Sequence, residues 1–130
     1  MDGLTVLDAS VLIAYFGPGD AHTEKSATLL AQAESLAAST ITLAEVLVGA
    51  ARTGRAGEML DALADLSVEE VPLGKGSAEG LALLRAETGL RIPDCCVLLA
   101  ADAASAEAVA TFDERLAKAA TQRGYRPTDS

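Results

Sequence analysis

Aromatic side chains are scarce in this chain of 130 residues, which has two tyrosines, two phenylalanines and no tryptophan. Its hydrophobic core must therefore be mainly aliphatic, and the 50% hydrophobic content is sufficient for one domain over residues 1–130. Cysteine is also rare. Cys95 and Cys96 are adjacent, a spacing that favours neither an intramolecular disulfide nor a cysteine-based metal site.

The scarcity of histidine and of basic residues excludes other classes. A Ser-His-Asp hydrolase would have to use the single histidine, His22, which we expect to be solvated, and no serine stands in a nucleophile-elbow context. The segment GKGSAEG at 74–80 lacks the spacing of a phosphate-binding loop. Ten basic residues against 19 acidic ones give a net charge of −9, which opposes tight nucleic-acid binding unless a metal ion inverts the local field.

No apolar run approaches the ~18 residues of a membrane span. The first ten residues, MDGLTVLDAS, have no basic region ahead of an apolar stretch, so they do not resemble a signal peptide. We therefore expect a cytoplasmic protein that does not interact with membranes.

Short apolar segments alternate with helical patterns along the chain. This alternation predicts an α/β fold with a parallel sheet covered on both faces, in which ligands gather at the carboxyl ends of the strands. The predicted strands are 4–7, 36–39, 68–72, 108–112 and 125–127. The predicted helices follow the first strand up to a break at 17–20, and then span 21–33, 42–51, 56–66, 77–88, 93–104 and 113–120.

Three carboxylates stand alone in apolar segments. Asp8 lies in LTVLDASVLIAYF, Glu45 in ITLAEVLVGAA and Asp94 in IPDCCVLLAA. A carboxylate in apolar surroundings must protonate, find a partner or bind a cation. None of these three segments contains a basic residue. We therefore expect the three acids to meet at a shared site, together with Asp113 of VATFDERLAKAA, and to bind a hard divalent ion there.

Helix capping is the alternative interpretation of each acid. Thr42 to Glu45 and Thr111 to Glu114 fit capping boxes, and Asp8 fits an N-cap. Asp94 would favour the first turn of its helix by charge alone. Ser10 and Thr111, each two residues from an acid, are predicted either to hydrogen-bond a ligand carboxylate, a water or a phosphate, or to act as ordinary caps.

The segments LDASVLIAYF, TLAEVLVGA, IPDCCVLLAADA and ATFDERLAKAA come in the order and rough spacing of the PIN-domain nucleases. The chain resembles most the single-domain VapC-type toxins of bacterial toxin–antitoxin systems. The resemblance implies a PIN-like three-layer α/β/α sandwich with a central, mostly parallel sheet of four to five strands. It also implies Mg²⁺- or Mn²⁺-dependent RNA cleavage that leaves 5′-phosphate and 3′-hydroxyl ends.

By this resemblance, Asp8, Glu45, Asp94 and Asp113 are the catalytic and metal-binding acids, and Thr111 is the hydroxyl before the last acid. A further acid found in some relatives is absent, since Arg115 and Leu116 stand there. The resemblance also implies a cognate antitoxin, an RNA substrate and toxin homodimers.

Two other hypotheses remain open from the sequence. A magnesium-dependent phosphatase or receiver-like domain also places an aspartate after its first strand, but Ser10 stands where such phosphatases need a second acid. A non-catalytic binding module could instead use its acidic pocket to hold a basic peptide. Loss of activity on replacing Asp8 and Asp94 would distinguish an enzyme from such a module.

Overall fold

The computed structural model describes residues 3–17 and 19–128; Pro18, inside the predicted break after the first helix, lies outside this range. Strands and helices alternate as predicted, and no boundary differs from its prediction by more than two residues. The strands are β1 (Leu4–Leu7), β2 (Ser35–Ser39), β3 (Val68–Val71), β4 (Ala108–Ala110) and β5 (Arg126–Pro127). The helices are α1 (Ala9–Phe16), α2 (Thr23–Gln32), α3 (Thr40–Arg52), α4 (Ala56–Asp65), α5 (Ser77–Thr88), α6 (Ile92–Ala103) and α7 (Glu114–Gln122).

The five described strands form one sheet in the order β3-β2-β1-β4-β5, and every pairing is parallel. This confirms the prediction of a parallel sheet. The strand β1 lies at its centre and is apolar apart from Thr5, whereas β3 and β5 form the edges. The edge strand β3 carries exposed Glu69 and Glu70, which suits a strand paired on one side only.

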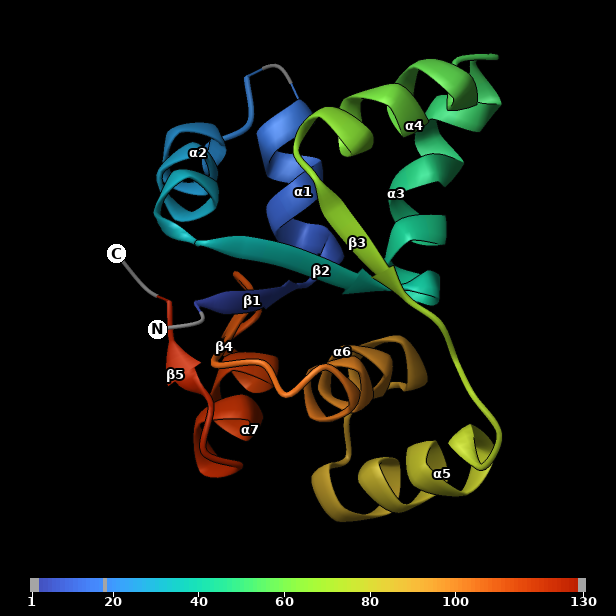
Figure 1. The fold of residues 1–130 in the computed structure, drawn as a ribbon, viewed down its shortest axis with the longest axis vertical. Coiled ribbons are helices and arrows are strands. Elements are labelled where there is room, and N and C mark those ends of the chain that lie inside the picture. The colour runs from blue at the N-terminus through green and yellow to red at the C-terminus, as the bar shows by residue number, and fades with distance from the viewer. Residues whose placement is uncertain (1–2, 18, 129–130) are drawn as a thin grey trace.

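Helices cover both faces of the sheet, as Figure 1 shows: α1 to α4 lie on one face and α5 to α7 on the other. Successive side chains of a strand point to opposite faces, so each central strand contributes to both cores. Val6 of β1 packs into the core beneath α5 to α7, and Leu7 into the core beneath α1 to α4. The chain therefore forms the α/β/α sandwich that was expected.

Two boundary differences concern the site. The strand β4 ends at Ala110 rather than at residue 112, because the backbone N–H groups of Phe112 and Asp113 donate to side-chain hydroxyls instead of to a neighbouring strand. The helix α3 begins at Thr40 instead of residue 42, because Ser39 caps it by accepting a hydrogen bond from the Thr42 N–H.

Cys95 and Cys96 are both buried free thiols in α6, in agreement with the expectation of no disulfide. None of the helices formed by the described residues combines the length and the apolar character needed to cross a membrane.

Candidate metal and active site

The carboxyl ends of the central strands gather the predicted site residues at one edge of the sheet. Asp8 directly follows β1, and Thr111 and Asp113 follow the neighbouring strand β4. Parallel strands end at the same edge, so these segments lie side by side. Glu45 reaches this region from α3, and Asp94 from the first turn of α6.

The carboxylate of Asp8 is held by two hydroxyl groups. The Ser10 Oγ donates to Asp8 Oδ2 at 2.8 Å, and the Thr111 Oγ1 donates to the same oxygen at 2.7 Å. The other oxygen, Oδ1, accepts no hydrogen bond from the described residues. Asp8 is only 8% exposed, yet the described part of the chain has no buried side-chain oxygen without a partner, so Oδ1 must still contact solvent. One oxygen is therefore fixed and the other is free to bind a ligand.

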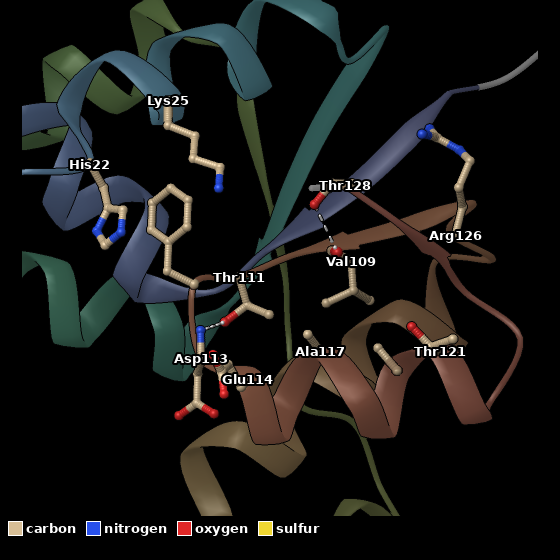
Figure 2. A pocket seen from close by; sticks show the side chains of 12 residues that line it. His22, Lys25, Val109, Thr111, Asp113, Glu114, Ala117, Thr121, Arg126 and Thr128 are labelled. Atoms are coloured by element: carbon tan, nitrogen blue, oxygen red, sulfur yellow. Dashed lines mark hydrogen bonds between the residues drawn. The ribbon is translucent and has the colours of Figure 1, made fainter. Parts of the chain in front are cut away.

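The same two hydroxyls receive hydrogen bonds from the backbone beyond β4. The Phe112 N–H donates to Ser10 Oγ at 3.1 Å, and the Asp113 N–H donates to Thr111 Oγ1 at 3.0 Å, the second of which is drawn in Figure 2. Each hydroxyl thus accepts a hydrogen bond from the backbone and directs its own hydrogen at Asp8. This arrangement joins the ends of β1 and β4 and orients the carboxylate.

Asp113 is the N-cap of α7, so the capping box suggested for Thr111 to Glu114, which would begin at Thr111, is wrong. Its Oδ1 accepts from the Arg115 N–H at 2.9 Å and from the Leu116 N–H at 3.1 Å. Its Oδ2 accepts no hydrogen bond from the residues described. Capping therefore occupies one oxygen of Asp113 and does not prevent the other from binding a ligand.

Glu45 and Asp94 are electrostatically coupled to the other acids. Burial raises the pKa of the Asp94 carboxyl, and the negative charges of Asp8 and Asp113 raise it further. Partial burial likewise raises the pKa of Glu45, an exposed residue of α3, with contributions from the charges of Asp8 and Asp94. All four predicted acids therefore lie within electrostatic range of at least one other, which separate helix caps would not require.

The capping box suggested for Glu45 is wrong, whereas Asp8 is an N-cap by position only. Asp8 occupies the N-cap position of α1, but its side chain makes no capping hydrogen bond. Glu45 cannot complete a capping box with Thr42, because the N-cap of α3 is Ser39. Asp94 does lie in the first turn of its helix, where its charge is favourable.

Two arginines near the acids were not predicted as site residues. The positive charges of Arg91 and Arg115 lower the pKa of Asp94, and Arg91 also lowers that of Glu45. Arg115 donates to the Gly89 carbonyl at 3.3 Å, which holds it between α7 and the end of α5. Arg115 occupies a position near the last acid at which some relatives have a further acid. That difference in the sequence was the one indication of a cation at the site.

The chemistry of the donors fits a hard divalent cation. Within residues 3–17 and 19–128, no three His, Cys, Asp or Glu side chains form a ready-made metal cage. Magnesium, however, keeps several waters and uses only one or two carboxylates in many sites. The free Asp8 Oδ1 and the repulsion among Asp8, Glu45 and Asp94 provide such oxygen ligands and a reason to bind a cation.

Three solved structures are similar to this chain. A toxin–antitoxin complex from Klebsiella pneumoniae has 27% sequence identity and a TM-score of 0.70, with 84% of this chain and 86% of that chain covered. VapC20 of Mycobacterium tuberculosis, a toxin that cleaves the sarcin–ricin loop, has 16% identity and a TM-score of 0.75, covering 97% and 99%. VapBC2 of Rickettsia felis, bound to a DNA fragment from their promoter, has 18% identity and a TM-score of 0.65, covering 92% of each chain.

No curated protein matches the sequence. The sequence model of the PIN domain, in contrast, matches residues 5–122, from β1 to the end of α7. This match includes Asp8, Glu45, Asp94 and Asp113, and it contradicts the receiver or phosphatase hypothesis. The chain belongs to the PIN domain family.

Proposed function

We propose that this chain is a metal-dependent endoribonuclease and the toxin of a toxin–antitoxin pair, with residues 1–130 forming a single PIN-like nuclease domain. The observation that carries the proposal is the carboxylate of Asp8, which two hydroxyls fix through one oxygen while the other stays free. The raised pKa values of Glu45 and Asp94 add support, because the charge of Asp8 contributes to both and these acids therefore lie near it.

In this proposal, Asp8 and Asp94 are the main ligands of a Mg²⁺ or Mn²⁺ ion, and Glu45 and Asp113 complete its surroundings. When bound, the ion would neutralise the carboxylates, polarise a phosphodiester and lower the pKa of an attacking water. Ser10 and Thr111 keep the ligand oxygen of Asp8 oriented, which is the role that neighbouring hydrogen bonds commonly have around metal ligands.

Glu45 is the acid best suited to accept the proton of the attacking water. Its pKa is raised in the direction of neutral pH, near which the pKa of an effective general base lies, and its side chain is exposed. Asp113 is less suited, because one of its oxygens already caps α7. Arg91 and Arg115 would compensate charge on the RNA phosphates near the acids.

The proposed partners are an RNA substrate and a cognate antitoxin, with toxin homodimers as the oligomeric state. The Klebsiella pneumoniae relative is a toxin–antitoxin complex, and the Mycobacterium tuberculosis relative is a toxin that cleaves an RNA loop. Both descriptions suit an acidic site that a basic side chain of an antitoxin could also occupy. Because its substrate and antitoxin would be found there, we propose that the chain acts in the cytoplasm.

The test is cleavage of a mixed pool of structured RNA by the purified chain with Mn²⁺, with Mg²⁺ and with EDTA. Asp8→Asn and Asp94→Asn should abolish metal-dependent cleavage. Asp61→Asn is the matched control, since Asp61 is exposed on α4 and should not affect cleavage.

Metal-dependent cleavage that Asp8→Asn and Asp94→Asn leave intact would reject this site, and cleavage in EDTA would reject the metal. A folded chain that binds Mn²⁺ but cuts no RNA in the pool would favour a binding module over a nuclease.

A further inference from the structure

A hollow of about 450 Å³ lies between α2, α7 and the end of β4, adjoining the acidic site. Figure 2 shows its walls: His22 and Lys25 project from the start of α2, Ala117 and Thr121 from α7, and Arg126 from β5. Asp113 lines one end of the hollow and also belongs to the acidic site proposed above, so the two adjoin. A molecule that reaches the acids can therefore extend into this hollow.

The extended segment after β4 connects the two places. Thr111 and Phe112 both line the hollow. Thr111 also donates a hydrogen bond to Asp8 of the acidic site, and Phe112 stacks on His22. Asp113, next along the chain, borders the hollow and also raises the pKa of Asp94. The hollow and the acids thus share one short segment of chain.

An aromatic stack forms one wall of the hollow. The rings of Phe112 and His22 lie 4.4 Å apart between centroids, at an interplanar angle of 19°. The His22 side chain is 52% exposed, so the stack is open to a ligand on the side of His22, whereas Phe112 is partly buried. In a chain with only four aromatic residues of the Phe and Tyr type, an accessible stack beside the acids is a distinctive feature. Planar groups such as nucleobases bind to surfaces of this kind.

Positive charge accompanies the stack. The Lys25 Nζ lies 6.0 Å from the centroid of the Phe112 ring, and Arg126 stands at another wall of the hollow. The guanidinium of Arg126 pairs with Glu107 at 3.1 Å, which leaves Lys25 as the stronger candidate for an incoming anion. Both cations stand in a chain whose net charge is −9, and they occur where a phosphate next to a stacked base would need them.

We propose that this hollow binds one nucleotide of the RNA strand adjacent to the cleaved phosphodiester. The base stacks against Phe112 and His22, and its phosphate contacts Lys25. The proposal rests on the ribonuclease function proposed above and adds a substrate-binding subsite to it. An aromatic surface joined to a cation recognises a base and a phosphate together, which favours RNA over a peptide as the occupant.

Photochemical crosslinking tests the subsite without relying on cleavage. Single-stranded RNA oligonucleotides containing 5-iodouridine are irradiated with the Asp94→Asn chain in Mn²⁺ and with the unchanged chain in EDTA. We expect crosslinks to peptides that contain Phe112 or His22 in at least one condition. An excess of unlabelled RNA should suppress them, whereas an excess of mononucleotide should suppress them much less if the occupant is part of a strand.

Two substitutions provide an independent readout of RNA affinity. Phe112→Leu should weaken binding of the oligonucleotide about 5- to 150-fold, the range for loss of one base–aromatic stack, and Phe112→Tyr should restore it. Phe16→Leu is the matched control, because Phe16 packs into the core beneath α1 to α4 and does not line the hollow. Urea unfolding of all three variants separates lost binding from lost folding.

Lys25→Gln should lower the slope of log affinity against log salt concentration by about 0.7, the value for one phosphate contact on a single strand. Lys75→Gln, in the exposed loop before α5, should leave that slope unchanged.

Crosslinks that map only to other surfaces, together with an unchanged affinity of folded Phe112→Leu, would overturn the subsite even if the chain cuts RNA. Crosslinks at Phe112 or His22 in a chain that cuts no RNA would support the subsite and reject the nuclease. If an excess of mononucleotide suppresses the crosslinks as strongly as an excess of unlabelled RNA, the occupant is a free nucleotide, and the strand-binding proposal is overturned.

Discussion

The hydroxyl of Thr111 should contribute both to folding and to catalysis, and Thr111→Val removes it with little change of shape. The substitution deletes a hydrogen bond to the Asp8 carboxylate and leaves the Asp113 N–H without its acceptor. A hydrogen bond to a charged group is worth about 1.5–3 kcal/mol, and an unsatisfied donor costs about 1–3 kcal/mol. Both hydrogen bonds are only partly buried, so water replaces part of the lost interactions. We therefore expect the free energy of unfolding to fall by about 2 kcal/mol.

Urea unfolding in EDTA measures this loss. For a small protein with a denaturant slope of about 2 kcal/mol per molar urea, 2 kcal/mol lowers the midpoint by about 1 M. Thr28→Val is the matched control, since the exposed Thr28 hydroxyl donates only to the Glu24 carbonyl within α2. The control should shift the midpoint by less than about 0.3 M, as exposed substitutions change stability by under about 0.5 kcal/mol.

The catalytic effect should be separable from the effect on stability. Loss of a group that orients a metal ligand commonly reduces metal affinity or activity 10- to 100-fold. We expect RNA cleavage by folded Thr111→Val to fall in that range, and Ser10→Ala to have a similar effect because both hydroxyls donate to Asp8 Oδ2. A Thr111→Val chain with an unchanged urea midpoint and an unchanged cleavage rate would refute this account of the site.

Four further outcomes follow from the structure. Saturating Mn²⁺ at 100 times its Kd should stabilise the chain by about 2.7 kcal/mol in thermal unfolding, and Asp94→Asn should remove most of that gain. In EDTA, the raised pKa values of Glu45 and Asp94 mean that the folded chain holds these protons more tightly than the unfolded chain. The free energy of unfolding should therefore fall as the pH rises above their ordinary pKa values of 4.5 and 3.8. The urea midpoint of Asp94→Asn should fall less steeply with rising pH than that of the unchanged chain. Cys95 and Cys96, 0% and 1% exposed, should resist alkylation until the chain unfolds, so rapid labelling of the native chain would contradict the packing of α6. Asp113→Ala should cost about 1 kcal/mol in urea unfolding through loss of the α7 cap, whereas no change would show that the cap hydrogen bonds are replaced by water.

The strands and three of the acids could be predicted from sequence because each is a local signal. A buried parallel strand is largely apolar, as Leu4 to Leu7 is apart from Thr5, and a single carboxylate in such a context stands out by charge alone. Strand order could not be predicted. The central place of β1 depends on its pairing with β2 and β4. The residues paired with β1 lie about 30 residues away along the chain in β2 and about 100 residues away in β4.

The hydrogen bonds from Ser10 and Thr111 to Asp8 agree with one of the two interpretations that the sequence left open. Thr111 lies 103 residues from Asp8, and the sequence alone could not distinguish a cap from a ligand-orienting hydroxyl. The capping patterns also misled: Thr42 and Glu45 fit a capping box, but Ser39 is the N-cap because α3 begins earlier. Helix starts extend by one or two residues at little cost, so a pattern of four residues does not fix the first one.

The place of a lone carboxylate in the most apolar segment of the chain has an electrostatic explanation. Burial of Asp8 is unfavourable, but two hydroxyl donors on Oδ2 compensate for much of the lost hydration and leave Oδ1 in contact with solvent. Glu45 and Asp94 accept no hydrogen bond from the described residues, and burial, followed by the negative charges of neighbouring acids, raises their pKa values. The fold thus places these acids near Asp8 at a cost in free energy. A divalent cation would relieve that cost, which explains why a chain with a net charge of −9 can keep its acids together at the end of its central strand.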